Sequence, residues 1–135
     1  MPAQTTGRIT FANWEERPVG GEGAGPRLAH ASVTNSFSGG IEAPDTTCEY
    51  SLVYISEKTG AFTGLELLTG RLDGRAGTFV LEERGSFDPD GTVRCTFDVV
   101  PGSGTGELAG LTGSGGYVCR PGEPSFPYDF TYQVG

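Results

Sequence analysis

Apolar and polar residues alternate with a period of two along most of the chain. The alternation is clearest near the C-terminal end, where Phe126, Tyr128, Phe130, Tyr132 and Val134 are separated by more polar residues. Successive side chains of a β-strand point to opposite faces of the sheet, so this period predicts strands. We expect eight of them, at residues 7–16, 28–37, 48–56, 61–71, 77–83, 93–99, 116–120 and 126–134.

Short polar turns separate most of these segments. Asp73-Gly74 and Asp90-Gly91 are strong signals for tight hairpins between antiparallel strands. Because hairpins join neighbours and no helical period intervenes, we expect an all-β, eight-stranded antiparallel up-and-down β-barrel. A β-sandwich is the alternative. A barrel of this size has room for packed side chains or for one small ligand.

The alternation also predicts which residues share a face. In the first strand it places Ile9 and Phe11 on one face and Trp14 on the other, and in the third it places Cys48 and Tyr50 together. The faces of the second strand both mix small and polar residues. The orientation of that strand stays open at this point.

Two glycine-rich segments interrupt the pattern. Residues 18–26 contain four glycines and two prolines, which predicts a flexible loop and a candidate lid. Residues 101–117 contain a GxGxxA motif at 104–109, but neither a helix nor a βαβ unit follows, so we do not expect nucleotide binding. We expect this segment to form one helical turn and to close one end of the barrel with Leu108 and Leu111.

Composition limits the class of partner. The 135 residues suit a single domain, residues 1–135, and the formal net charge of −8 disfavours nucleic acids and anionic membranes. No apolar run is long enough to span a bilayer, and the first residues lack the features of a signal peptide. We therefore expect a soluble, cytoplasmic protein.

Cysteines and histidine give little support for metal chemistry. The three cysteines form no CxxC pair, and His30 is the only histidine. We expect buried thiols without disulfides, no metal site and no cofactor.

Three segments resemble a known family. FTGLELLTGRLDGRAGTFVLEERGSF (62–87), VVPGSGTGELAGLTGSGGY (99–117) and ASVTNSFSG (31–39) are similar to the bacterial domain-of-unknown-function 3224 family. The resemblance implies a small calycin-like barrel of the allene oxide cyclase type and no settled activity. Related barrels include actinobacterial cyclases of linear polyketides. Asn35 stands where the family usually has lysine, and Glu82-Glu83 stands where it usually has Gln-His.

Four residues are candidates for catalysis. Glu66 and Glu83 lie on strand faces that also carry apolar residues, so both carboxyls would enter the lumen if those faces turn inward. Burial would then raise their pKa values and suit them to proton transfer. Tyr50 offers a phenol donor and His30 offers an imidazole base. The alternative is that one or both glutamates point to solvent or pair with Arg71, Arg84 or Arg94. His30 would then be a core or surface residue without a catalytic role.

Aromatic residues are numerous enough to line a pocket. The candidates for substrate binding are Trp14, Tyr54, Phe79, Leu81, Phe97, Tyr117, Tyr128, Phe130 and Tyr132. Such walls would hold a hydrophobic molecule, and the phenols would bind a carbonyl. A barrel filled by these side chains, without any cavity, is the alternative.

The leading hypothesis is a cofactor-independent cyclase or isomerase of secondary metabolism. It would fold a hydrophobic, polyketide-derived chain inside the barrel and promote intramolecular ring closure such as a cycloaddition. A binding or carrier barrel without chemistry is the second hypothesis, and a filled structural barrel is the third. Val53 and Ile55 offer outer-face contacts for a homodimer.

Overall fold

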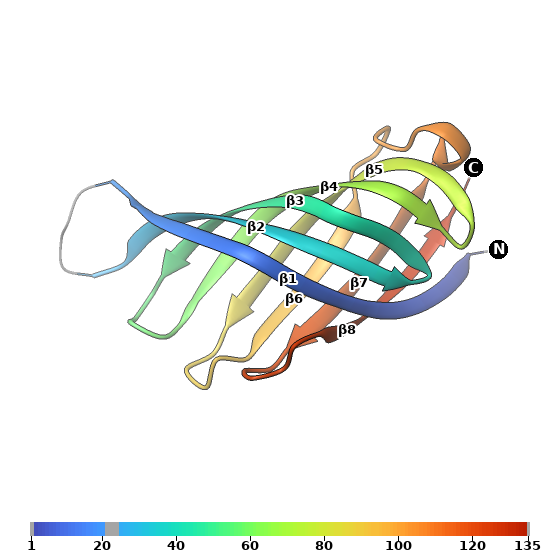
Figure 1. The fold of residues 1–135 in the computed structure, drawn as a ribbon. Coiled ribbons are helices and arrows are strands. Elements are labelled where there is room, and N and C mark those ends of the chain that lie inside the picture. Colours follow the sequence, from blue (N-terminus) through green and yellow to red (C-terminus); the bar gives the residue numbers. More distant parts are fainter. Residues whose placement is uncertain (1, 21–24, 135) are drawn as a thin grey trace.

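Eight strands pair in the order in which they occur in the chain, and the last pairs with the first to close the barrel (Figure 1). The structure is a computed structural model that describes residues 2–20 and 25–134. The strands are β1 (Ala3–Val19), β2 (Arg27–Gly39), β3 (Ile41–Tyr54), β4 (Gly60–Leu72), β5 (Arg75–Phe87), β6 (Val93–Val99), β7 (Thr112–Cys119) and β8 (Phe126–Gln133). All pairs are antiparallel. The predicted fold class is confirmed, and the sandwich is excluded.

The strands are longer than the sequence pattern predicts. Pro18 and Val19 pair with Ala29 and Leu28, so the start of the expected 18–26 loop belongs to β1. Residues 21–24 of that candidate lid lie outside the described residues. The Asp73-Gly74 turn is confirmed, with positive φ angles of 47° and 88° at its two residues. Among the described residues, no helix is long and apolar enough to cross a membrane.

A β-bulge in β1 changes which side chains face the interior. The register with β2 shifts between Ala12 and Glu15, and Asn13 takes a left-handed φ of 58°. One extra residue in a strand inverts the inward and outward alternation beyond it. Trp14 therefore lies on the same side as Phe11, and the prediction that it lies opposite Phe11 is wrong.

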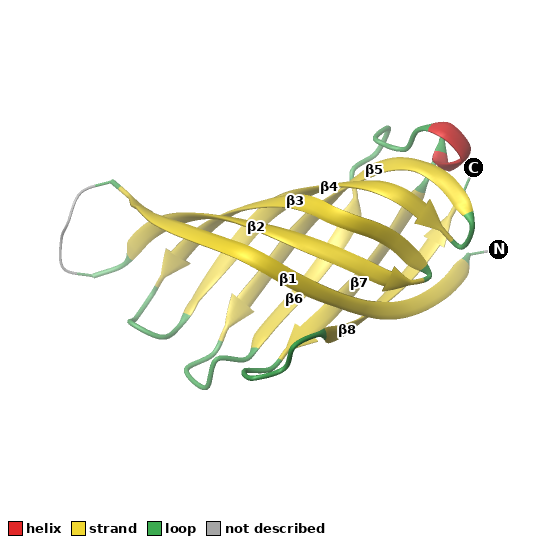
Figure 2. Ribbon diagram, in the orientation of Figure 1, coloured by secondary structure: helices red, strands yellow, loops and turns green. Residues whose placement is uncertain are grey.

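The glycine-rich segment after β6 closes one end of the barrel. It contains the 3-10 turn η1 (Gly106–Leu108), which lies over the barrel end in Figure 2. The Thr105 N–H donates to the Thr78 carbonyl of β5 at 2.9 Å, which ties the segment to the sheet. Leu108 and Leu111 are fully buried in the core below, so the predicted plug is confirmed.

The barrel interior has two parts. The sealed half lies beneath the plug and contains Ile9, Phe37, Ile41, Ala43, Leu68, Leu72, Phe79, Leu81, Phe97, Val99, Leu108, Leu111, Phe126, Tyr128, Phe130 and Tyr132. The open half lies at the other end and contains Ala29, Ala31, Val33, Cys48, Tyr50, Leu52, Phe62 and Cys95.

Candidate functional site

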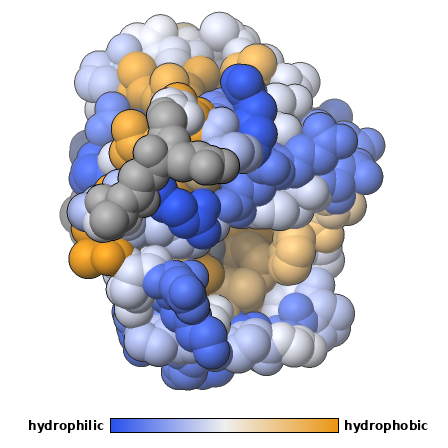
Figure 3. Space-filling view, turned by 90° about the vertical axis from the view of Figure 1, so that its left-hand side faces the viewer, coloured by the Kyte–Doolittle hydropathy of each residue, from blue (hydrophilic) through white to orange (hydrophobic). Residues whose placement is uncertain are grey.

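The open half contains a pocket of about 450 Å³, which also borders Phe126 of the sealed half. This volume is in the range of sites for small molecules. Figure 3 shows the hollow on the molecular surface, with apolar residues inside it. Its lining is mostly apolar and aromatic: Phe11, Trp14, Val33, Asn35, Tyr50, Leu52, Tyr54, Glu57, Lys58, Phe62, Phe87, Asp88, Pro89, Gly91, Val93, Tyr117, Cys119 and Phe126.

Small residues on the strands leave this space. The inward positions of β2 in the open half are alanines and a valine rather than large side chains. Gly64 of β4 has no side chain, and a Cβ added there would lie only 2.5 Å from the Tyr50 ring, so the ring packs directly on the strand backbone. The Phe62 ring packs on Gly85 in the same way, because a Cβ added at Gly85 would lie 2.4 Å from that ring. The rings therefore cover the wall and leave the centre open.

Two phenols form the polar part of the pocket floor. The Tyr50 and Tyr117 hydroxyls are 3.2 Å apart, and the Tyr50 hydroxyl donates to Glu83 Oε1 at 3.0 Å. Burial raises the pKa of both phenols well above the usual value, so both keep their protons at neutral pH. The floor therefore offers neutral hydroxyl groups to a ligand.

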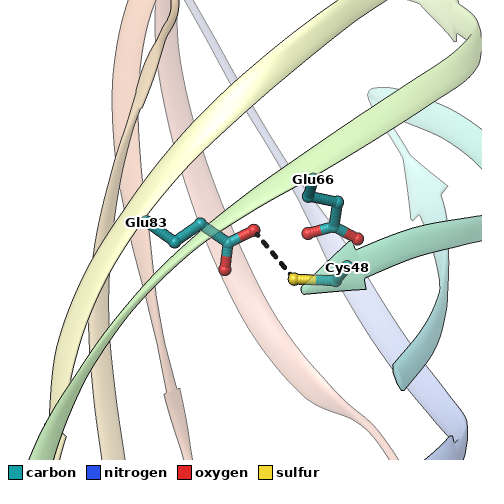
Figure 4. A group of neighbouring side chains, drawn as sticks. All are labelled: Cys48, Glu66 and Glu83. Carbon is teal, nitrogen blue, oxygen red and sulfur yellow. Dashed lines mark hydrogen bonds between the residues drawn. The ribbon is translucent and has the colours of Figure 1, made fainter. Parts of the chain in front are cut away.

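Two buried carboxyls lie behind the phenols. Glu66 on β4 and Glu83 on β5 are each 1% exposed, and both point into the barrel beside Cys48 (Figure 4). Asn35 Nδ2 donates to Glu66 Oε2 at 3.0 Å, and the Thr46 hydroxyl donates to the same oxygen. The thiols of Cys48 and Cys95 contact Glu83 at 3.8 and 3.6 Å.

Glu83 holds a proton more strongly than an exposed glutamate does. Burial raises its pKa well above 4.5, and the adjacent Glu66 carboxyl raises it further. Hydrogen bonds from Tyr50 and Cys95 oppose these effects only in part. The site therefore combines a carboxyl of raised pKa with a phenol that reaches the pocket, which is an arrangement suited to general acid chemistry.

Cys48, Glu66 and Glu83 also have the donor atoms of a metal site, and these atoms lie within 4.8 Å of one another. Among the described residues, however, no buried side-chain nitrogen or oxygen lacks a hydrogen-bond partner. No orphaned ligand atom points to an ion, so we assign no metal to this group. The absence of a metal stays a prediction.

A hydrogen-bonded group lies at the pocket mouth. Past the bulge, Trp14 Nε1 donates to Glu16 Oε1 at 3.3 Å, and the Tyr54 hydroxyl also donates to Glu16. The guanidinium of Arg27 lies 3.9 Å from the centre of the Tyr54 ring. Trp14 and Tyr50 are neighbours, with ring centres 6.1 Å apart, so the mouth and the floor are connected by aromatic contacts.

The structure brings together only part of the predicted site. Glu66, Glu83 and Tyr50 meet inside the barrel, and Trp14, Tyr54 and Tyr117 line the pocket. His30 lies on the outer face, with Nε2 3.6 Å from Glu49, and is separated from the pocket by the barrel wall. The remaining predicted residues pack in the sealed half, away from the pocket: Phe79, Leu81, Phe97, Tyr128, Phe130 and Tyr132.

Sequence reasoning missed several residues of the site. Asn35 and Thr46 bind Glu66, Cys95 binds Glu83, and Phe62 forms a wall. A signal for Asn35 was present, because it continues the period-two series of small residues at positions 29, 31 and 33. A polar residue in that series indicates a polar group inside the barrel. Thr46 offered no such signal, since it precedes the expected third strand.

Comparison with known proteins places the chain near one family. The family model described as "Protein of unknown function (DUF3224)" matches residues 5–132. A crystal structure of a DUF3224 protein of unknown function from Shewanella oneidensis MR-1 is 26% identical, with a TM-score of 0.77. The match covers 100% of this chain and 99% of that one. No curated protein matches the sequence.

Proposed function

The chain belongs to the DUF3224 family of proteins of unknown function, and from this premise we propose that its open half is a cofactor-independent isomerase or cyclase site. The substrate is a mainly apolar molecule that inserts a carbonyl group toward Tyr50 and Tyr117. The observation that carries the proposal is an aromatic pocket of about 450 Å³ with two phenols at its floor, one of which is hydrogen-bonded to a buried carboxyl whose pKa is raised. The family description and the similar crystal structure are both of unknown function, so neither supports nor opposes the proposal.

The chemistry follows from the contacts of Tyr50. Its hydroxyl lies between Glu83 and Tyr117, so a proton on Glu83 allows the phenol to turn its own hydrogen toward a ligand. A hydrogen bond to a carbonyl draws electrons from the conjugated chain and makes it more reactive. The aromatic walls exclude water and hold the chain folded, so that its reacting ends meet.

Ring closure in such a substrate needs no cofactor. It converts π bonds of the chain into carbon–carbon σ bonds, and no atom or electron is gained or lost. The product is an isomer of the substrate with the same mass. A linear polyketide-derived polyenone has the required combination of a greasy chain and a carbonyl, and it is the substrate class that we propose.

Binding is tested first, with a neutral aromatic enone. Trp14 is the only tryptophan in the chain, and it lines the pocket, so its fluorescence reports on this site. We expect trans-naphthylbutenone to quench it in a saturable manner. Replacing both floor phenols (Tyr50→Phe with Tyr117→Phe) removes two hydrogen bonds, and we expect the Kd to rise about 5- to 10-fold.

Tyr132→Phe is the matched control, because it removes a phenol from the sealed half whose hydroxyl bonds Asp73. It should leave the Kd unchanged. Circular dichroism of each variant checks that the barrel is intact. Equal Kd values in the double variant and the control would contradict the role of the floor phenols.

Turnover is tested with a linear conjugated trienone. A cyclic isomer of unchanged mass, found by gas chromatography and mass spectrometry and reduced in Tyr50→Phe, supports the enzyme. Saturable binding with complete recovery of the linear compound would instead support a carrier. The carrier is the second candidate, because the pocket lining contains Tyr50 and Tyr117 but neither carboxyl.

A further inference from the structure

The oxygen contacts of Glu66 and Glu83 indicate that the pair carries a negative charge. Asn35 Nδ2 and the Thr46 hydroxyl both donate to Glu66 Oε2. Glu83 Oε1 accepts hydrogen bonds from the Tyr50 hydroxyl and the Cys95 thiol, and Glu83 Oε2 accepts one from the Cys48 thiol. These partners of the two carboxyls are all donors, which suits a pair that keeps a negative charge. Burial and the neighbouring Glu66 carboxyl raise the pKa of Glu83, which favours one proton on the pair. Two carboxyls with one proton between them leave one net negative charge inside the barrel.

No cation of the described residues neutralises this charge. The ion pairs of the described chain involve His30, Arg84 and Arg94, whose partners are other acidic side chains. The titratable groups that face the carboxyls are Cys48 and Tyr50 from β3, Cys95 from β6 and Tyr117 from β7. These groups are neutral or negative in every protonation state, so none can balance a buried carboxylate.

The charge is close to any ligand that reaches the floor. The Tyr50 hydroxyl is 3.0 Å from Glu83 Oε1, and a ligand atom bonded to this hydroxyl lies about 3 Å beyond it. The ligand head is therefore within about 6 Å of the nearer carboxyl, Glu83, and one oxygen of Glu66 lies within 4.8 Å of a Glu83 oxygen. Like charges at this separation repel strongly in a site with little water. At the mouth, Lys58 is accompanied by Glu57 and Asp88, so the pocket has no net positive charge to offset this repulsion.

We propose that the Glu66–Glu83 pair makes the pocket selective for an uncharged carbonyl head, as in a ketone, aldehyde or ester, and excludes the carboxylate of the same skeleton. The inference rests on the proposed function and narrows its substrate class. A free fatty acid or polyketide acid would be rejected at the floor. The neutral ketone or ester of the same chain would be accepted.

Two ligands of nearly identical shape test this selectivity. Trans-naphthylbutenone and trans-naphthylacrylate differ only in a methyl group that is replaced by a charged oxygen. Their Kd values are measured by Trp14 fluorescence at neutral pH and, independently, by equilibrium dialysis. In the wild-type protein we expect the ketone to bind roughly 10- to 100-fold more tightly than the carboxylate.

Variants test whether the carboxyl pair carries the charge. Glu66→Gln leaves a single carboxyl whose burial favours the protonated form, so we expect the preference for the ketone to fall by about tenfold or more. Glu83→Gln also leaves a single buried carboxyl and should lower the preference as well. Glu49→Gln on the outer face is the control, since it changes the net charge of the protein equally and Glu49 lies beside His30.

The outcomes separate this inference from the proposed function. Equal affinity of the wild-type protein for both ligands would overturn the selectivity while leaving the site in place. An unchanged preference in Glu66→Gln would overturn the role of the carboxyl pair. If neither ligand binds the wild-type protein, the proposed function fails, and the selectivity fails with it. The wild-type comparison remains decisive even if Glu66→Gln does not fold.

Discussion

The sealed and open halves of the barrel are made by the same eight strands, but they differ in side-chain volume and polarity. The sealed half is filled by large apolar residues, and Phe130 alone stacks or tilts against Phe79, Phe97 and Tyr132. Alanine residues of β2 and two buried carboxyls occupy the corresponding interior of the open half. We infer that one end of the barrel stabilises the fold and the other provides the binding site.

Removing one phenylalanine from each half tests this division most strongly. Phe130 is fully buried, so Phe130→Ala creates an enclosed cavity and should lower the free energy of unfolding by about 3–5 kcal/mol. Phe62 borders the pocket, so Phe62→Ala enlarges an existing space and should cost about 1.5–3 kcal/mol. Urea unfolding measures both values. A larger loss for Phe62→Ala would contradict the comparison.

Replacing one valine in each half by phenylalanine should affect a different property in each half: stability in the sealed half and ligand affinity in the open half. Val33 and Val99 are both 6% exposed, but only Val33 lines the pocket. Val99→Phe overpacks the sealed half and should cost about 1–3 kcal/mol without changing ligand affinity. Val33→Phe fills the pocket and should weaken naphthylbutenone binding by about tenfold or more.

Thermal unfolding and Trp14 fluorescence give the two readouts for each valine variant. If Val33→Phe destabilised the barrel as much as Val99→Phe does, the open half would be as tightly packed as the sealed half.

The alternation of residues was sufficient to predict the barrel but not the difference between its halves. Both halves have the same period of two, and whether an interior is full depends on the sum of side-chain volumes across all eight strands. Tyr128, Phe130 and Tyr132 were predicted to bind substrate because they are aromatic and face inward. The structure places them in the sealed half, because the plug of Leu108 and Leu111 covers that end.

Local irregularities account for the other differences. Trp14 was assigned to the wrong face because no residue pair indicates a β-bulge as clearly as Asp-Gly indicates a turn. Asn13 is only one of several residues that tolerate a positive φ. Glu66 and Glu83 were found because each follows apolar residues at spacing two. Their contact depends on the β4–β5 register, in which Glu66 pairs with Leu81 and Gly64 pairs with Glu83.

The carboxyl pair predicts a pH dependence that is specific to the open half. The unfolded chain releases the Glu83 proton near its ordinary pKa of 4.5, whereas the folded protein retains it to higher pH. The unfolded state therefore binds fewer protons above that pH, and the free energy of unfolding falls as pH rises. The slope from this one group is at most about 1.4 kcal/mol per pH unit.

Glu83→Gln removes this contribution, so its stability relative to the wild-type protein should increase with pH. Urea unfolding of both proteins from about pH 5 to about pH 8 measures the difference between their free energies of unfolding. Groups that titrate equally in both proteins do not contribute to this difference. A difference that stayed constant with pH would show that Glu83 titrates alike in the folded and unfolded chain.

Thiol labelling should give the smallest effect, and it reports directly which cysteines a reagent in solution can reach. Cys119 lines the pocket and is partly exposed, whereas Cys48 and Cys95 are buried beside Glu83. We expect iodoacetamide to label only Cys119 in the folded protein and all three cysteines after unfolding.

Burial raises the pKa of Cys119, so this labelling should be slow at neutral pH. Naphthylbutenone should slow it further, and equal labelling of all three thiols in the folded protein would contradict a closed interior.

A crystal structure with bound naphthylbutenone would show whether the floor of the open half recognises a carbonyl. We expect the ligand inside the open half, with its carbonyl oxygen about 2.7–3.2 Å from the Tyr50 or Tyr117 hydroxyl and its rings against the aromatic wall. A ligand bound on the outer surface, or one inserted with its carbonyl toward the mouth, would contradict carbonyl recognition by these phenols.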